Sequence, residues 1–449
     1  MASTCCDCHY PLDPKNQRIE SAHKHYKSTT RCTRLQVAEK PIIMSLLLWS
    51  FTCWMMVQAV SSLLIQPKTW IWNGHSIAYD LAQSESKPES QSQSQYNSKI
   101  SSSSSSDNSI NSINSNNNNN NNNNNHNHNI LLLNGFGVGS FHQHRLITAL
   151  LSSNDQTNNC IIYAVDYLGQ GNSWPINCHD GNSFHEQGLH YSADTWLDQL
   201  DDFISTVIGT TEDSLLTIVG NSLGGYLAVA LAHRQTHSIN SLVLLNATPV
   251  WGLNLPGWSG HLPPPYVPRF IGRTIFDWIR NIKTIDKYLD TAYYHREAFQ
   301  GTLPQQIQSC TQGNGGHAAF ASILWSPPAS GYNWFTKLSQ LPCHCLLLFG
   351  AQDPWCTPAF AKKMLQSLPK KSNFAKRYLE LDHVGHCPNH EAPQAVATAI
   401  TKWMYASNKQ TTALGCSTFS EPWGDIQMKE KNEQDISLTL LDWFAITFV

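Results

Sequence analysis

A serine between small residues separates two patterned segments of the chain. The sequence GNSLG at 220–224 follows an apolar run at 215–219 and precedes an Ala- and Leu-rich helical pattern over 223–233. A G-x-S-x-G spacing between a strand and a helix is typical of a sharp turn that raises the serine hydroxyl above a sheet. Glycine suits this turn because larger side chains would collide there. We therefore predict Ser222 as a nucleophile.

A serine hydroxyl is a weak nucleophile near neutral pH, so it needs a histidine base that a carboxylate holds in the correct tautomer. Asp353 and His386 each follow a later apolar run, in the chain order Ser, acid, His that accompanies such a turn. Asp382 and His383 lie close enough in the sequence to compete. The glycine before His386 favours that histidine, so we predict Asp353 as the acid and His386 as the base.

Acyl transfer also needs N–H donors for the oxyanion of the tetrahedral intermediate. We predict the backbone N–H of Leu223 as one donor and that of Phe136, in the loop NGFGVG at 134–139, as the other. The glycine spacing of this loop fits neither a P-loop nor a dinucleotide fingerprint, so nucleotide binding is not expected. Asp166 comes too early in the chain for the acid, and we predict a structural role for it.

Short apolar runs and helical patterns alternate along the chain, which predicts an α/β fold with a mostly parallel sheet and helices on both faces. Apolar residues between 196 and 207 recur at helical spacing, as do those of 223–233. A Pro-rich segment followed by helical material at 252–341 interrupts the pattern, so we predict a helical cap inserted between late core strands. The predicted strands are 130–133, 161–165, 215–219, 242–245, 345–349 and 378–381.

The boundaries of the predicted domain follow from shifts in composition. An N-terminal extension covers 1–40, and the catalytic domain covers 68–415, opening with two short strands around an Asn-Gly turn within 69–82. The Ser-, Gln- and Asn-rich segment 84–129 is predicted to be a disordered insertion, because it buries too little apolar surface to order. Residues 416–449 are assigned to a C-terminal tail.

The segment 41–67 contains no charged residue and is rich in Leu, Ile, Met, Trp and Val, with lysines and arginines before it. It is typical of a membrane-directed segment. A spanning helix and a signal sequence that starts near Met44, with cleavage around 59–62, are equally compatible with it. Membrane association of the protein is therefore one of two open interpretations.

Composition excludes several partners. Charged residues make up 14% of the chain and the net charge is -3, without a basic stripe, so nucleic acid is not an expected partner. The 13 cysteines follow no repeated spacing, which argues against a disulfide scaffold. The cluster Cys5, Cys6, Cys8 and His9 lacks a second ligand pair at zinc-finger spacing. We expect neither a metal nor an organic cofactor.

Several segments together resemble the pheophytinase family, plastid α/β hydrolases of chlorophyll breakdown. The resemblance spans most of 70–407, and the elbow alone would indicate only the superfamily. The similar segments are NGFGVGSF at 134–141, AVDYLGQGNS at 164–173, GNSLGGY at 220–226, LLNATPVWG at 244–252, FASIL at 320–324, DPW at 353–355 and GHCP at 385–388.

The resemblance implies an α/β-hydrolase fold and a chloroplast serine esterase that removes phytol from pheophytin to give pheophorbide. It also assigns the nucleophile, acid and base roles to Ser222, Asp353 and His386. An apolar ester would be the substrate, and we expect Trp251, Phe320 and Trp355 to contact it. Aromatic residues of the cap, which also include Trp258, Trp325 and Trp334, would suit a flat macrocycle with an isoprenoid tail, although such residues equally often form a cap's own core.

Two other functions are compatible with the same residues. A carbon–carbon bond hydrolase shares the Gly-Asn-Ser elbow and a helical cap, and it would act on vinylogous diketones rather than on phytyl esters. A hydrolase-fold receptor would bind a ligand under the cap with little or no turnover, and ligand-dependent thermal stabilisation would identify it.

Overall fold

The computed structural model describes a large part of one compact unit that spans Val57–Val449. The predicted extension 1–40 and the proposed tail beyond 432 lie outside the described residues. So do 41–64 of the apolar segment and 84–127 of the polar insertion. The described residues are 65–83, 128–152, 160–174, 192–210, 215–235, 238–251, 265–312, 320–321, 325–328, 333–370, 373–406, 409 and 413–432.

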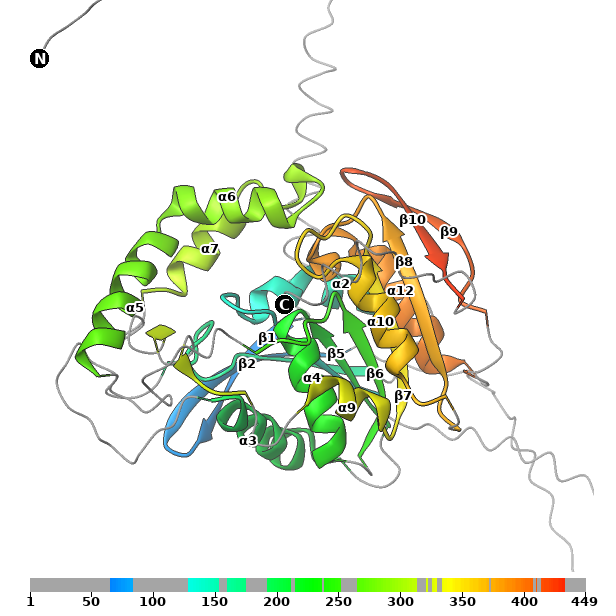
Figure 1. Cartoon of the computed structure of the whole chain (residues 1–449), viewed down its shortest axis with the longest axis horizontal. Helices are drawn as coiled ribbons and strands as arrows, with labels where there is room; N and C mark the ends of the chain where they lie inside the picture. The colour runs from blue at the N-terminus through cyan, green and yellow to red at the C-terminus, as the bar shows by residue number, and fades with distance from the viewer. Residues whose placement is uncertain are drawn as a thin grey trace, which may run out of the picture. The chain divides into compact units, whose positions relative to one another are not determined.

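The described strands form a single sheet in the order β1-β2-β4-β3-β5-β6-β7-β8-β10-β9. The six neighbours from β4 to β8 in this order are parallel, and an antiparallel pair flanks them at each edge (Figure 1). All six predicted parallel strands are confirmed. The strands are β1 Ile65–Trp72, β2 His75–Gln83, β3 His128–Leu133, β4 Cys160–Val165, β5 Leu215–Asn221, β6 Ile239–Leu245, β7 His344–Gly350, β8 Lys376–Asp382, β9 Ser417–Glu421 and β10 Gly424–Glu430.

The apolar strand runs are explained by burial on both faces. In β3, Leu131 and Leu133 point into one core cluster, and Ile130 and Leu132 point into the other. Because successive side chains of a strand alternate between faces, a strand buried on both sides must be apolar throughout. The same alternation in β7 places Leu347 in the first cluster and its neighbours in the second.

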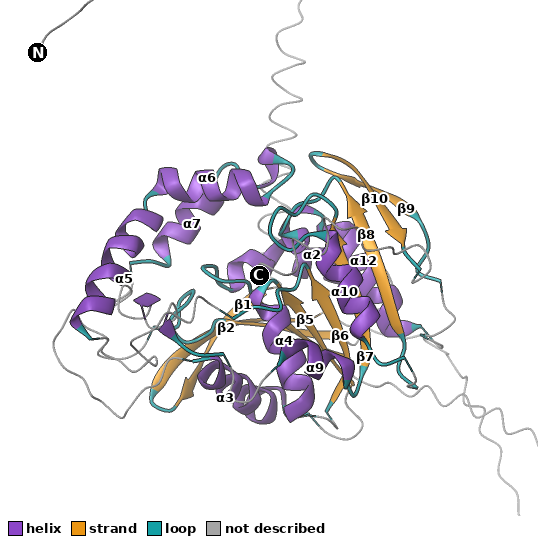
Figure 2. Ribbon diagram, in the orientation of Figure 1, coloured by secondary structure: helices purple, strands orange, loops and turns teal. Residues whose placement is uncertain are grey.

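Helices cover both faces of the sheet, as predicted (Figure 2). Helices α2 (His144–Ser152) and α12 (Pro393–Tyr405) pack together over one face. The other face is covered by four helices: α3 (Ala193–Phe203), α4 (Leu223–Arg234), α9 (Trp334–Ser339) and α10 (Pro358–Ser367). The helical turn Ile204–Ile208 extends α3 on this face, whereas the turns at Ser140–Gln143 and Pro388–Glu391 contact α2 on the first face.

The cap is an arch of helices inserted between β6 and β7 (Figure 1). It contains α5 (Tyr266–Ile279), α6 (Ile282–Ala292), a turn at Arg296–Ala298 and α7 (Leu303–Ser309). The predicted cap range 252–341 is too long at its C-terminal end. Helix α9 falls within that range, yet Trp334 and Leu338 are buried against α4 and α10 in the core of the domain.

Two predicted boundaries of the domain are also corrected. Strand β10 pairs with β8 and buries Ile426 and Met428, so the sheet continues well beyond residue 415 into the predicted tail. At the other end, Ile65–Pro67 already belong to β1, and residues 128 and 129 of the proposed insertion belong to β3. Among the helices that the structure describes, none is long and apolar enough to cross a membrane.

Candidate active site

Ser222 occupies a strained turn between β5 and α4. Its φ of 53° and ψ of -116° are unusual for a residue other than glycine. The turn is held by the N–H of Ser222, which donates to the carbonyl of Leu245 over 2.9 Å. A Cβ atom on Gly220 would lie 2.4 Å from the carbonyl oxygen of Gly224, and one on Gly224 would lie 2.4 Å from that of Leu133. The packing therefore requires glycine on both sides of the serine.

The structure brings Asp353 and His386 together at the carboxyl ends of β7 and β8. Nδ1 of His386 lies 2.7 Å from Oδ2 of Asp353, and both residues are buried. The other carboxylate oxygen accepts backbone N–H groups from Trp355 at 2.8 Å and Cys356 at 3.0 Å. With Nδ1 donating to the carboxylate, Nε2 of the imidazole is left to accept a proton.

Charge and hydrogen bonding keep this carboxylate ionised. Burial by itself raises the pKa of Asp353, but the adjacent His386 and the hydrogen bonds from His386, Trp355 and Asn246 outweigh it. The pKa of Asp353 therefore lies below its ordinary value. A carboxylate that stays charged is suited to holding one tautomer of the imidazole.

The competing residues are placed elsewhere. His383 has a left-handed backbone, with a φ of 63°, and its ring stacks on Tyr294. Asp382 accepts a hydrogen bond from Gln352 and lies 3.7 Å from Nζ of Lys429. Among the described residues, neither Asp382 nor His383 lines the cavity that contains Ser222 and His386.

Two asparagines that the sequence analysis missed connect the site. Asn246 donates to Oδ2 of Asp353 over 2.7 Å and accepts from the N–H of Gly350 over 2.9 Å. Asn221 donates to the carbonyl oxygens of Leu245 and His386. Asn246 thus fixes the carboxylate, and Asn221 ties the serine turn to the histidine loop. Asn221 is the last residue of β5 and Asn246 directly follows β6, and this position at a strand end is the one signal that pointed to them.

The predicted oxyanion loop lies directly against the serine. A Cβ atom added to Gly135 would be 3.4 Å from Cβ of Ser222, and the next residue is Phe136. Leu223 is the first residue of α4, where helix geometry leaves the backbone N–H without an intrahelical acceptor. The loop carrying Phe136 and the helix beginning at Leu223 therefore flank the serine, as the proposed donors require.

Two side chains from the loop after β4 hold this glycine-rich loop. Oε1 of Gln170 accepts from the N–H of Gly137, and Oδ1 of Asp166 accepts from the N–H of Ser140 over 2.6 Å. Within the described part of the chain, Nε2 of Gln170 is buried without a hydrogen-bond partner while the residue lines the cavity. Burial raises the pKa of Asp166 to about 7, against the opposing hydrogen bonds from Asn172 and Ser140.

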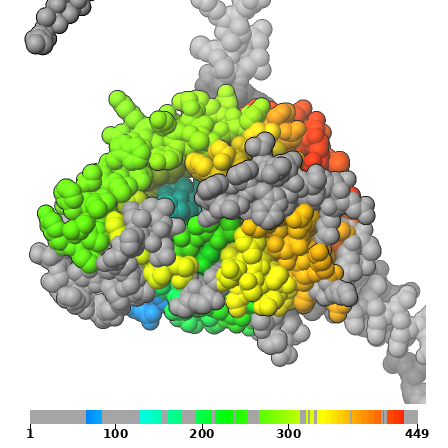
Figure 3. Space-filling model, viewed as in Figure 1, coloured from blue at the N-terminus to red at the C-terminus, as the bar shows by residue number. Residues whose placement is uncertain are grey.

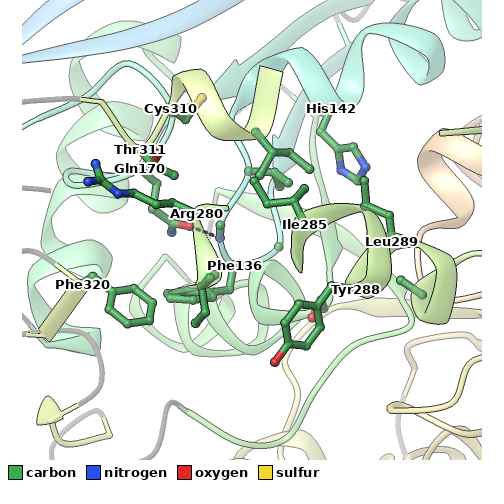
Figure 4. A pocket seen from close by; sticks show the side chains of 18 of the residues that line it. Phe136, His142, Gln170, Arg280, Ile285, Tyr288, Leu289, Cys310, Thr311 and Phe320 are labelled. Carbon is green, nitrogen blue, oxygen red and sulfur yellow. Dashed lines mark hydrogen bonds between the residues drawn. The ribbon is translucent and has the colours of Figure 1, made fainter. Parts of the chain in front are cut away.

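A cavity of about 470 Å³ opens between the cap and the ends of the strands (Figure 3). Ser222 and His386 lie in its wall with the predicted contact residues Phe320 and Trp355. Most of the remaining wall is apolar, and much of it comes from the cap (Figure 4). The cap residues are Phe276, Ile279, Arg280, Ile285, Tyr288, Leu289, Ala292, Ile307, Cys310 and Thr311.

The expectation that Trp251 contacts the substrate is corrected. Among the described residues, it is not part of the cavity wall. Its indole is buried edge-to-face against Trp196, near Tyr226, and its N–H donates to Ser326 over 3.0 Å. Trp251 lies in the segment that follows β6 and belongs to the core cluster on one face of the sheet instead. Trp258 lies outside the described residues.

A buried polar chain also reaches the cavity. His142 lines the wall, and its Nε2 lies 2.8 Å from the hydroxyl of Tyr293, which lies 3.1 Å from Nδ1 of His390. Burial, together with the nearby charges of Arg145 and His386, lowers the pKa of His142 to about 3. His142 is therefore neutral near pH 7 and adds no charge to the apolar wall.

Asp353, Cys356 and His386 could in principle hold a metal, since their ligand atoms lie within 4.8 Å of one another. However, the carboxylate and imidazole are already joined by a hydrogen bond. Burial and the neighbouring Asp353 raise the pKa of the Cys356 thiol well above its ordinary value, whereas a metal requires the thiolate. The three groups fit an acid–base pair beside a neutral thiol better than a metal site.

Over residues 130–399 the chain matches the Alpha/beta hydrolase family. The match covers more than half of the chain, which therefore belongs to this family and has its fold.

Three individual proteins that the chain resembles share at most 30% identity with it. The chain is 30% identical over 308 residues to the chloroplastic pheophytinase of Arabidopsis thaliana, covering 61% of this chain and 60% of that protein's length. It is 25% identical over 299 residues to the proline iminopeptidase of Lactobacillus delbrueckii subsp. bulgaricus, covering 62% and 90% of the two chains. A solved structure of the meta-cleavage product hydrolase from Pseudomonas fluorescens IP01 aligns with a TM-score of 0.49 and 17% identity, covering 77% of this chain and all of that one. The relatives indicate a hydrolase.

Proposed function

We propose that this protein is a serine carboxylic-ester hydrolase that removes phytol from pheophytin to give pheophorbide. The observation that carries the proposal is that His386, hydrogen-bonded to the buried Asp353, lines the same apolar cavity as Ser222 on its strained turn. The 30% identity to a pheophytinase supports the choice of ester.

In the proposed reaction, Nε2 of His386 takes the proton of the Ser222 hydroxyl as the oxygen attacks the ester carbonyl. The N–H groups of Phe136 and Leu223 stabilise the negative oxygen of the tetrahedral intermediate. His386 then protonates the leaving alcohol, and an acyl-enzyme remains. Water, activated by the same histidine, releases the acid and restores the serine. The reaction as proposed needs neither a metal nor an organic cofactor.

The wall of the cavity supports an apolar substrate. The cap contributes aliphatic and aromatic side chains such as Ile285 and Leu289, and the one carboxylate of the pair is buried behind His386. Transfer of an isoprenoid chain from water to such a wall is favourable, because it removes apolar surface from water. Gln170 offers a buried N–H donor that we propose hydrogen-bonds to a polar group of the substrate.

The proposal is tested by multiple-turnover hydrolysis of pheophytin a, with pigments separated by chromatography. We expect the full chain to form pheophorbide and the Ser222→Ala variant to form none. Chlorophyll a is the second substrate, because a preference for the metal-free pigment would distinguish the proposed activity from general phytyl-ester cleavage. Folded wild-type protein that yields no pheophorbide would contradict the assignment.

A chloroplast location is part of the same proposal. It is supported by the identity to a chloroplastic relative. Imaging of the full chain fused at its C-terminus to a fluorescent protein would test it, and fluorescence outside plastids would contradict it.

A carbon–carbon bond hydrolase is the second candidate, since the chain is 24% identical over 153 residues to the 2-hydroxy-6-oxo-2,4-heptadienoate hydrolase of Pseudomonas putida. Turnover of a vinylogous diketone without any turnover of phytyl esters would favour it.

A further inference from the structure

Helix α5 of the cap is apolar on two separate sides. On the inner side, Phe276 and Ile279 line the cavity. A second apolar stripe lies on the outer side, and α5 forms the outer edge of the arch in Figure 1. The stripe consists of Tyr266, Val267, Phe270, Ile271 and Trp278, whose exposed fractions are 72%, 62%, 62%, 39% and 58%.

The members of the outer stripe share one side of the helix. At 3.6 residues per turn they fall within about 140° of its circumference, an arc that also contains Thr274 and Asp277. Other large exposed apolar side chains of the described residues, such as Ile71 on β1 and Phe374, are isolated from it in the sequence. Exposed apolar patches mark interaction sites.

Charge on the same helix indicates what covers the stripe. Arg269, Arg273 and the C-terminal Arg280 fall beside the outer stripe, and Arg280 also lines the cavity. The single acid of the helix, Asp277, pairs with Arg273 at 3.9 Å and with Arg280 at 2.7 Å, so three arginines and one aspartate leave the helix with a net charge of +2. Aromatic residues stand at both ends of the stripe. Arginines beside an aromatic and aliphatic face are characteristic of helices that lie in the interface of a bilayer with anionic lipids. At 14 residues, about 21 Å, α5 is too short to cross the bilayer core of about 30 Å.

The stripe is also continuous with the cavity. The ring of Trp278 packs edge-to-face on that of Tyr288, with centroids 6.2 Å apart, and Tyr288 lines the cavity wall. The Trp278–Tyr288 pair therefore connects the stripe to the cavity wall.

We propose that the outer stripe of α5 docks onto the surface of a bilayer that contains anionic lipid, so that apolar substrates enter the cavity directly from the membrane. The stripe inserts among the headgroups and acyl chains, and the arginines contact the lipid anions. This function of the cap goes beyond ester hydrolysis and does not depend on which ester is cleaved.

Hydrogen–deuterium exchange tests the proposal in the full chain, because it reports on α5 separately from any other membrane-binding segment. The probe is vesicles of phosphatidylcholine with one third phosphatidylglycerol. We expect exchange in peptides covering 266–279 to slow by at least about threefold on addition of these vesicles, and by less with pure phosphatidylcholine.

A matched pair of variants locates the effect. The double substitution Val267→Ser and Phe270→Ser should abolish the slowing at α5, because it removes the centre of the stripe. Ile71→Ser removes an equally exposed apolar side chain from β1 and should leave the slowing unchanged. Unchanged unfolding temperatures show that both variants are folded.

Exchange at α5 that vesicles do not change in the wild type, or that they slow equally in the double variant, would overturn the proposal. Slowing that instead rises with protein concentration in the absence of vesicles would assign the stripe to a second copy of the chain and also overturn it. Since the measurement needs no turnover, failure to hydrolyse pheophytin would leave this result standing.

Discussion

Replacement of Asp353 by asparagine changes one atom of the side chain, and the structure offers the new amide group no acceptable position. One carboxylate oxygen accepts from the N–H groups of Trp355 and Cys356, and the other accepts from Asn246 and His386. In either orientation, the NH2 group of the asparagine would therefore face hydrogen-bond donors instead of acceptors. The imidazole alone can adapt, by moving its proton to Nε2 so that Nδ1 accepts.

An imidazole protonated at Nε2 cannot take the proton of Ser222. We therefore expect Asp353→Asn to lower kcat about 10⁴-fold, close to 5 kcal/mol of transition-state stabilisation, with KM changed by only a few-fold. The assay is hydrolysis of p-nitrophenyl butyrate, a small ester that we expect to make few contacts with the cap. Asp382→Asn is the matched control, since Asp382 holds Gln352 rather than the imidazole, and it should change kcat by less than about twofold. An Asp353→Asn variant that keeps more than about a tenth of kcat would refute the reasoning, because the correct tautomer would then survive without the carboxylate.

Three further outcomes follow from other contacts. Asn246→Leu removes the donor to Asp353, and we expect the free energy of unfolding in urea to fall by about 2–4 kcal/mol, whereas an unchanged urea midpoint would show that the bond contributes little. Gln170→Leu deprives Gly137 of its acceptor and should lower kcat for p-nitrophenyl butyrate about 10–100-fold, with Gln170→Glu, which keeps an acceptor, restoring most of it. The pKa of Asp166 is raised to about 7, so the folded protein keeps a proton that the unfolded chain releases above about pH 4, and stability falls as the pH rises until Asp166 ionises at about pH 7. Between pH 6.5 and 8 the wild type should therefore lose about 0.8 kcal/mol more stability than Asp166→Asn, and equal losses would contradict the raised pKa.

The central sheet could be predicted from the sequence because its strands are buried on both faces and therefore read as continuous apolar runs. The edge strands at the C-terminus could not. In β10 only Ile426 and Met428 are deeply buried, and they alternate with polar residues in a short segment. Such a pattern has little apolar content, and its pairing with β8 depends on contacts across the fold that no local signal records.

The same difference separates the predicted from the missed parts of the site. Ser222 stands in a turn whose glycines are dictated by its own geometry, so a local motif reveals it. Asn246 and Gln170 act on partners 107 and 33 residues away in the chain. A single asparagine or glutamine after a strand is common, and its role exists only once folding has brought the strand ends together. Trp251 is the opposite case: its position in the sequence suggested a contact with the substrate, but its side chain packs into the core.

The cap contacts the proposed base, His386, more directly than the proposed nucleophile, Ser222. Ser222 is held by the sheet and its nearby segments: its N–H donates to Leu245 at the end of β6, and its carbonyl accepts from the N–H of Thr248 just beyond that strand over 3.1 Å. His386, by contrast, donates its backbone N–H to the carbonyl of Ala292 at the end of α6 over 2.7 Å. Gly385 fits so closely that a Cβ atom would lie 2.1 Å from the same oxygen, and Glu391 accepts N–H groups from both Gly385 and the cap residue His295. We therefore expect a displacement of α6 to move His386 relative to Ser222, so that substrate binding at the cap wall, as proposed, would also affect the geometry of the proposed proton transfer.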